Sequence, residues 1–324
     1  MQKILVIRGG ALGDFILTLP VIQTLKQNYP GAEVELIGHL PFLLLGKNYI
    51  SRAHSLIHPR WSSLYLDTPL KQPLVEHLAL FDMIISYIGD STSIFNLHLK
   101  GIKGERFIHC NPNPPVLKTH MIEYLLTPLK SLKVKPARQP VIILDEKDKE
   151  YASKFFQQHH LQPEKLIAIH PGSGSRKKRW KLEWFIELSS LLNRGGEVIF
   201  ILGEAEEDLK DTLREITLGS HTFSGLSLIQ TAAILNSCSL YIGNDSGITH
   251  LAAALGVPTI AIFGPTNPQN WAPRGKTVHV LFSDRISCSP CSREERNRCS
   301  HQRCLEAVST EEVVNTAAKI LNFL

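Results

Sequence analysis

The stretch KILVIRGGALGD, residues 3–14, combines a strand, a glycine-rich turn and the start of a helix. Residues 3–7 form a short apolar run rich in β-branched side chains, which is typical of a strand covered on both faces. The apolar spacing of the following FILTLPVIQTLKQNYP predicts a helix over about 15–28. A strand that passes through glycines into a helix predicts the first unit of a parallel α/β sheet.

The same pattern recurs along the chain. Further strands are expected in AEVELIG (32–38) and DMIISYIG (82–89), and then in LIAIH, EVIFILG, SLYIGND and PTIAIFG between residues 166 and 264. The segment 131–148 mixes prolines and charges, which is typical of a boundary between domains. We therefore predict an α/β protein with two Rossmann-like, doubly wound parallel-sheet domains, 1–148 and 149–324, facing a cleft.

Composition narrows the class of protein. The chain has 324 residues, 43% hydrophobic and 20% charged, with a formal net charge of +5, which is ordinary for a globular protein. Residues 1–148 carry 16 Lys and Arg against 12 Asp and Glu. This mild excess is either normal scatter or a preference for an anionic partner or membrane surface. No basic, aromatic-interleaved stripe indicates nucleic-acid binding, and the lack of a signal peptide or long apolar run favours a cytoplasmic protein.

The first glycine-rich turn fits a dinucleotide fingerprint only in part. Gly10 and Gly13 match its last two glycines and Glu35 lies about where its acidic residue would, but Arg8 stands at the first glycine. Asp14 would also occupy the place of a bound pyrophosphate. Asp14 is therefore either a plain helix cap or, if it faces the cleft, an ionised carboxylate able to take a proton from a hydroxyl.

Three loops of the second half follow strand ends, where doubly wound sheets bind ligands. HPGSGSRKKRW (170–180) pairs small residues with four cations, which indicates an anion site or, alternatively, a solvated basic turn. GNDSGITHLAAALG (243–256) predicts a helix N-terminus capped by Asp245 and suited to phosphate. FGPTNP (263–268) could contact a nucleotide. Together the loops suggest transfer from a diphosphate donor to a hydroxyl acceptor.

Three stretches together resemble glycosyltransferase family 9, which includes the lipopolysaccharide heptosyltransferases. They are ILVIRGGALGDFILTLPVIQTLKQNYPGAEV, HPGSGSRKKRW and YIGNDSGITHLAAALGVPTIAIFGPTNPQNWAP. The resemblance implies a GT-B fold, whose last helix (310–324) would pack back on the first domain. It also implies inverting transfer of heptose from ADP-heptose to a lipopolysaccharide (lipid A–core) acceptor, with peripheral contact at the inner face of the cytoplasmic membrane.

The resemblance also implies roles for individual residues. Asp14 would be the catalytic base, with Gly10 and Gly13 on the acceptor side, and Lys178 would neutralise the leaving diphosphate. The expected donor-binding residues are Ser173, Arg179, Asp245, Ser246, Gly247, His250 and Thr266. The absence of a D-x-D motif predicts catalysis without a divalent metal. The stretch YIGDSTSIFNLHLKG (87–101) departs from the family pattern, so the resemblance does not extend to this acceptor-side loop.

Two other functions remain open at this point. An NAD(P)-dependent oxidoreductase would bind its dinucleotide at residues 9–14. A non-catalytic nucleotide-sugar-binding protein would keep the donor loops without turnover, although Asp14 and Lys178 are both present.

Four cysteines cluster near the C-terminus. Cys288, Cys291, Cys299 and Cys304 have the spacing C-x2-C-x7-C-x4-C. Such a cluster in a cytoplasmic protein favours metal binding over disulfides, so the site is either a structural zinc site or a set of reduced thiols, with an iron–sulfur cluster less favoured. Cys110 and Cys238 are expected to be isolated core residues.

Overall fold

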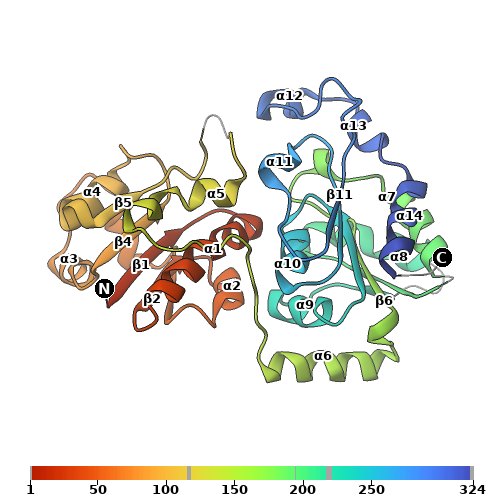
Figure 1. Ribbon diagram of the computed structural model, residues 1–324, viewed down its shortest axis with the longest axis horizontal. Helices are drawn as coiled ribbons and strands as arrows, with labels where there is room; N and C mark the ends of the chain where they lie inside the picture. The colour runs from red at the N-terminus through yellow and green to blue at the C-terminus, as the bar shows by residue number, and fades with distance from the viewer. Residues whose placement is uncertain (1, 115–117, 194, 217–220, 322–324) are drawn as a thin grey trace. The chain divides into compact units, whose positions relative to one another are not determined.

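The computed structural model describes residues 2–114, 118–193, 195–216 and 221–321 (Figure 1). The chain divides into two compact units, Met1–Ile143 and Leu144–Leu324. Asp145 caps helix α6 (Glu146–His159) by accepting a hydrogen bond from the Asp148 amide at 3.0 Å. The boundary expected at 148/149 therefore falls inside a helix, and the division comes just before that helix begins.

The first unit contains a five-stranded parallel sheet in the order β3-β2-β1-β4-β5 over its described residues. Its strands are β1 (Lys3–Arg8), β2 (Glu33–Gly38), β3 (Arg52–Ser55), β4 (Met83–Tyr87) and β5 (Phe107–His109). Its helices are α1 (Leu12–Asn28), α2 (Leu40–Leu43), α3 (Gln72–Ala79), α4 (Ile94–Lys103) and α5 (Met121–Leu125), with 3₁₀ turns η1 (Leu44–Gly46), η2 (Pro59–Tyr65), η3 (Gly104–Arg106) and η4 (Thr127–Leu132).

The described part of the second unit has a six-stranded parallel sheet in the order β11-β10-β9-β6-β7-β8. Its strands are β6 (Leu166–His170), β7 (Glu197–Ile201), β8 (His221–Phe223), β9 (Leu240–Asn244), β10 (Thr259–Ile262) and β11 (Val278–Leu281). Besides α6, its helices and 3₁₀ turns are η5 (Pro163–Lys165), η6 (Arg176–Lys178), α7 (Leu182–Leu192), η7 (Glu204–Leu209), α8 (Lys210–Ile216), α9 (Leu228–Leu235), α10 (Gly247–Leu255), α11 (Pro268–Trp271), α12 (Arg293–Arg298), α13 (Arg303–Glu306) and α14 (Thr310–Leu321).

Both strand orders are those of doubly wound sheets, so the predicted fold class is confirmed. The central strands β1, β6 and β9 are buried on both faces because helices cover both sides of each sheet. The carboxyl ends of β1 and β4, and of β6 and β9, are neighbours in their sheets. The loops that carry the candidate residues leave from these ends.

The final helix, α14, is part of the second unit. Its Val313 and Ala317 are fully buried in the core that also contains Phe185 and Leu188 of α7. Over its described length the helix therefore covers its own sheet, where the resemblance implied packing on the first domain; residues 322–324 lie outside the described residues. Among the residues described, no helix combines the length and hydropathy needed to cross a bilayer.

Candidate active site

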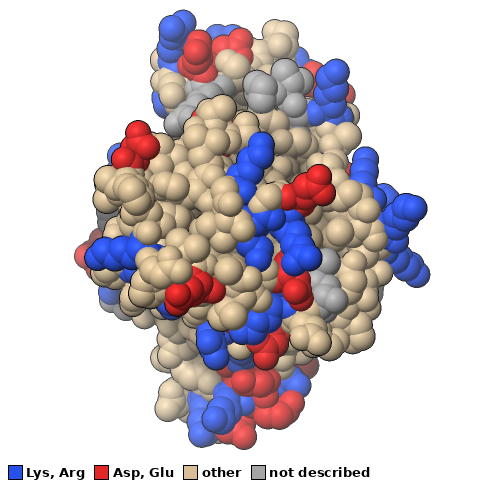
Figure 2. Space-filling model, turned by 90° about the vertical axis from the view of Figure 1, so that its left-hand side faces the viewer, with Lys and Arg blue, Asp and Glu red and all other residues tan. Residues whose placement is uncertain are grey.

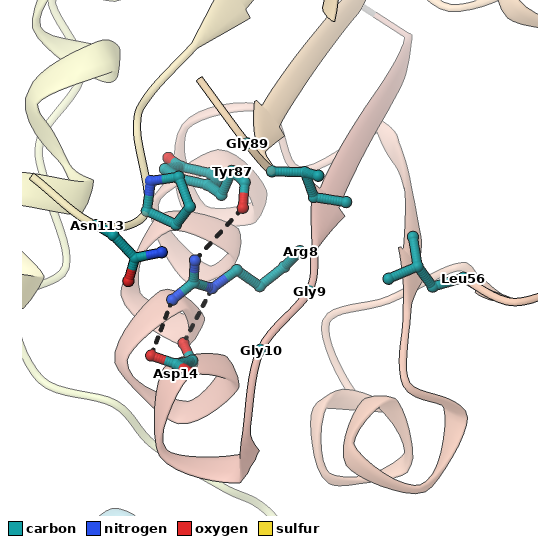
Figure 3. A pocket seen from close by; sticks show the side chains of 10 residues that line it. Arg8, Gly9, Gly10, Asp14, Leu56, Tyr87, Gly89 and Asn113 are labelled. Atoms are coloured by element: carbon teal, nitrogen blue, oxygen red, sulfur yellow. Dashed lines mark hydrogen bonds and ion pairs between the residues drawn. The ribbon is translucent and has the colours of Figure 1, made fainter. Parts of the chain in front are cut away.

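A cavity of about 230 Å³ opens at the carboxyl ends of β1 and β4 in the first unit (Figure 3). The walls come from the glycine-rich turn, the β3 and β4 ends and the loop after β5: Arg8, Gly9, Gly10, Asp14, Leu56, Tyr87, Ile88, Gly89, Pro112 and Asn113. The stretch that departs from the family pattern thus forms part of this wall. Buried Asn96 fixes that stretch by donating to the carbonyls of Ile88 at 2.7 Å and Asp90 at 2.6 Å.

Asp14 lies in this wall on the first turn of α1. The N-cap residue is Ala11 and Asp14 is the third helical residue, so Asp14 is not the N-cap itself, but its carboxylate bonds back to the cap as in a capping box. Its Oδ2 accepts a hydrogen bond from the Ala11 amide at 2.8 Å, and its Oδ1 lies 3.2 Å from Nη2 of Arg8. The side chain remains 32% exposed. Because a carboxylate offers about four acceptor positions, each oxygen can still accept a hydrogen bond from a ligand.

Arg8 holds this carboxylate, a role that the sequence did not reveal. Its side chain is only 2% exposed and also donates to the backbone oxygens of Asp14 and Tyr87, both at 3.4 Å (Figure 3). Burial lowers the pKa of Arg8, while the charge of Asp14 acts in the opposite direction. The available signal was a cation at the end of an otherwise apolar strand.

Gly10 is required by the position of Asp14. Its φ is +94°, and a Cβ built there would lie 2.5 Å from Oδ2 of Asp14. A side chain would therefore be strained and would also collide with the carboxylate. Gly13, the other expected acceptor-side glycine, lies within the first turn of α1 and does not line the cavity.

In the second unit, the N-terminus of α10 is the centre of the expected donor site. Ser246 caps the helix by accepting from the Thr249 amide at 3.3 Å, and Gly247 is its first residue. The cap expected at Asp245 is thus one residue too early. His250 is only 5% exposed on the same helix. The helix N-terminus presents amide groups and a partial positive charge suited to a phosphate.

Asp245 instead gathers three other expected donor residues. Nζ of Lys178 lies 3.0 Å from its Oδ2, the hydroxyl of Thr266 donates to the same oxygen, and the hydroxyl of Ser173 donates to its backbone oxygen at 2.8 Å. Asp245 is buried, whereas the Lys178 side chain is 21% exposed. This buried carboxylate therefore orients a partly accessible cation.

Arg179 is held by the protein. Its guanidinium lies 3.0 Å from Oε1 of Glu206 and donates to the Ser173 backbone oxygen at 3.2 and 3.1 Å. Glu206 is 3% exposed, and a Cβ on Gly172 would lie 2.2 Å from its Cδ. Arg179 therefore fixes the loop that precedes Lys178. No pattern in the sequence indicated a role for Glu206.

Asn244 joins two of the loops and was also missed. It is fully buried, donates to the Pro171 oxygen at 2.8 Å and accepts from the Trp180 amide at 2.9 Å. One side chain thus holds both ends of the 171–180 loop at the end of β9. Removing a buried polar side chain of this kind lowers stability, because its partners are left buried without a hydrogen bond.

The four clustered cysteines form no disulfide with one another. In the described part of the chain, no three His, Cys, Asp or Glu side chains gather closely enough to hold a metal ion. The thiol of Cys291 donates to the Cys288 oxygen at 2.9 Å, and that of Cys299 to the His301 oxygen at 3.3 Å. Burial raises the pKa of Cys291, and it raises that of Cys304 to about 11. All four are free thiols.

The two remaining cysteines, Cys110 and Cys238, are both 6% exposed, which confirms them as core residues.

Comparison with known proteins gives one consistent answer. The sequence profile of glycosyltransferase family 9 (heptosyltransferase) matches residues 113–301. Lipooligosaccharide heptosyltransferase 2 of Campylobacter jejuni is 25% identical over 96% of this chain and 95% of its own length. A glycosyl transferase family 9 structure from Veillonella parvula matches with a TM-score of 0.82 at 21% identity, over 100% of this chain and 98% of that one.

A second solved structure, E. coli ADP-heptose lps heptosyltransferase II, matches with a TM-score of 0.74 at 19% identity, over 99% and 98% of the two chains. At these identities the structures establish the shared fold. The profile covers more than half of the chain, including the loops around Lys178 and Asp245. This chain belongs to glycosyltransferase family 9.

Proposed function

We propose that this protein is an inverting glycosyltransferase that transfers heptose from ADP-heptose to a hydroxyl of a lipopolysaccharide core acceptor. The observation that carries the proposal is the Asp14 carboxylate in the wall of the first unit's cavity. Arg8 and the Ala11 amide hold it in place without occupying all its acceptor positions. Similarity to enzymes named for heptosyl transfer supports the choice of sugar and acceptor.

The chemistry follows from these groups. Asp14 accepts the proton of the acceptor hydroxyl while its oxygen attacks the anomeric carbon. The bond from that carbon to the diphosphate breaks on the opposite face, and ADP leaves with the bonding electrons. Lys178 and the amide groups at the start of α10 stabilise the growing charge on the diphosphate. Fixed cations thus take the part of a divalent metal, and we expect turnover to survive chelation.

The oxidoreductase alternative is disfavoured by Glu35. A ribose-binding carboxylate must be open to the ligand, but Glu35 is 2% exposed in the middle of β2. It lies 2.6 Å from Nε2 of His54 and 3.6 Å from Nζ of Lys3. Asp14 also occupies the turn where a dinucleotide pyrophosphate would bind.

A panel of nucleotide sugars tests the proposal. We expect ADP-heptose to stabilise the protein and to release ADP when a core acceptor is added. Lys178→Ala should weaken ADP binding and Asp14→Asn should abolish turnover while donor binding persists. Lys181→Ala is the matched control, because its exposed pair with Glu306 at 2.9 Å lies outside the donor loops. Stabilisation by NADH and by no sugar nucleotide would overturn the assignment.

Peripheral membrane contact is the remaining part of the proposal. Large exposed apolar side chains concentrate in the first unit, after the carboxyl ends of β2, β3 and β4: Leu40, Leu44, Ile57, Tyr65, Leu66, Ile94 and Leu97. Residues 36–66 contain Lys47, Arg52 and Arg60 but no Asp or Glu. Figure 2, which looks onto the side with α3 and α4, shows Lys and Arg side chains near the centre of this face, with Asp and Glu side chains beside some of them. Basic and apolar side chains together favour an anionic bilayer.

A further inference from the structure

The cysteine-bearing segment, residues 288–304, lies against two loops of the donor site. It follows β11 and contains α12. Nothing in the proposed chemistry uses its four thiols. Its contacts with the loops that carry Thr266 and Lys178 give it a place in the site.

The first contact is with the loop after β10. The hydroxyl of Ser289 donates to the Gly264 oxygen at 2.7 Å, and the Cys291 amide donates to the Pro265 oxygen at 2.8 Å. The packing is tight, since a Cβ on Gly264 would lie 3.3 Å from Sγ of Cys304. Thr266, which bonds to Asp245, is the next residue in this loop.

The second contact is with the basic loop. Nζ of Lys177 donates to the Cys299 backbone oxygen, and Nε2 of Gln302 donates to the Arg176 oxygen at 3.0 Å. Arg176 and Lys177 are the two residues that come before Lys178. The segment therefore holds in place the backbone next to Lys178, the lysine expected to bind the diphosphate.

Cys299 combines this contact with an accessible thiol. Its backbone oxygen accepts a hydrogen bond from Nζ of Lys177, while the thiol of this partly exposed residue donates to the His301 oxygen. A group added to the sulfur must displace that hydrogen bond and shift the turn that presents the carbonyl. Cys291 also contacts a donor loop through its backbone, but burial raises the pKa of its thiol, which disfavours the reactive thiolate.

We propose that residues 288–304 form a clasp that positions the donor loops, and that modification of Cys299 weakens binding of the nucleoside diphosphate. The inference rests on the proposed donor site. With a small-molecule disulfide, the Cys299 sulfur loses its proton and attacks one sulfur of the reagent. A mixed disulfide forms, and the second sulfur leaves as a thiolate that takes up the proton. A dithiol reverses the reaction.

ADP affinity, measured by calorimetry on the full chain, tests the clasp. Glutathione disulfide treatment should raise the Kd for ADP at least about fivefold, the lower range of coupling between sites, and dithiothreitol should restore it. Cys299→Ser should lose this response and Cys288→Ser should keep it. Without any reagent, Gln302→Ala should also weaken ADP binding, whereas Lys181→Met, which breaks an exposed pair with Glu306, should not.

The outcomes separate the clasp from the proposed function. An unmodified protein that fails to bind ADP refutes the donor site itself. If the unmodified protein binds and Lys178→Ala does not, the donor site stands. The clasp is then overturned by protein modified at Cys299 with an unchanged Kd, by a Cys299 that does not react, or by Gln302→Ala with wild-type affinity.

Discussion

The position of the Asp14 carboxylate requires that residue 10 has no side chain, and the substitution Gly10→Ala tests this requirement. The added methyl group would meet Oδ2 of Asp14 at 2.5 Å and Cγ at 3.0 Å, in a backbone conformation with φ +94°. Either the turn must change conformation or the carboxylate must leave the Ala11 amide and Arg8. Gly31→Ala is the matched control, because a Cβ there would meet no atom within 4 Å and Gly31 does not line the cavity.

Two magnitudes follow from this geometry. An L-residue in the left-handed region costs about 1–2 kcal/mol, so the free energy of unfolding should fall by about that amount. Ordinary contact begins at 3.4 Å, so the carboxylate must move by about 1 Å, and a misplacement of that size can cost about 10²-fold in rate. We therefore expect kcat to fall about 10²-fold, within the 10²–10⁴-fold that a general base contributes.

The assay is ADP release at saturating donor and acceptor, with urea denaturation of the same variants. Gly31→Ala should match the wild type in both measurements, and Asp14→Asn sets the lower limit of kcat. A Gly10→Ala protein with wild-type kcat would refute the reasoning, because the turn would then tolerate a displaced carboxylate. Equal losses in both glycine variants would also refute it.

Four further outcomes are expected. Arg8→Met should lower the free energy of unfolding by about 1–3 kcal/mol in urea denaturation, because a buried cation bonded to three oxygens is lost. Asn244→Leu should lower the free energy of unfolding by about 3 kcal/mol in the same measurement, because the Trp180 amide and the Pro171 oxygen each lose a buried hydrogen bond. Burial lowers the pKa of His170 in the folded protein below its value in the unfolded chain. As the pH falls below about 6.5, His170 therefore takes up its proton more readily in the unfolded chain, and the free energy of unfolding should decrease. If His170→Gln leaves the pH dependence of the unfolding free energy unchanged, this expectation is contradicted. Ile57→Asp should reduce cosedimentation with anionic vesicles, whereas Leu80→Asp, before β4, should not.

The sheet and its loops could be read from neighbouring residues. Buried central strands such as β1 and β9 are continuous apolar runs, and glycines mark the turns that follow them. The edge strands β3, β5, β8 and β11 were not predicted. They have three or four residues and are only partly buried, so their sequences carry little apolar pattern.

The site shows the same division. The glycine turn indicated Asp14, and four consecutive cations indicated the loop of Lys178. The helix cap was assigned to Asp245 because Asp and Ser are both good caps and only the backbone path selects Ser246. Arg8 attracted attention only as a mismatch to a dinucleotide pattern, although it holds the candidate base.

The sequence by itself determined the central strands of both sheets, the glycine turns and the residue types at two loops, because each depends on preferences of adjacent residues. Only the tertiary structure decided which charges meet. Lys178 and Asp245 are 67 positions apart, and Asn244 and Trp180 are 64. Such pairs form when the carboxyl ends of β6 and β9 come together as neighbours in the sheet. No local pattern encodes that distance, so the orientation of each charge is a property of the folded chain.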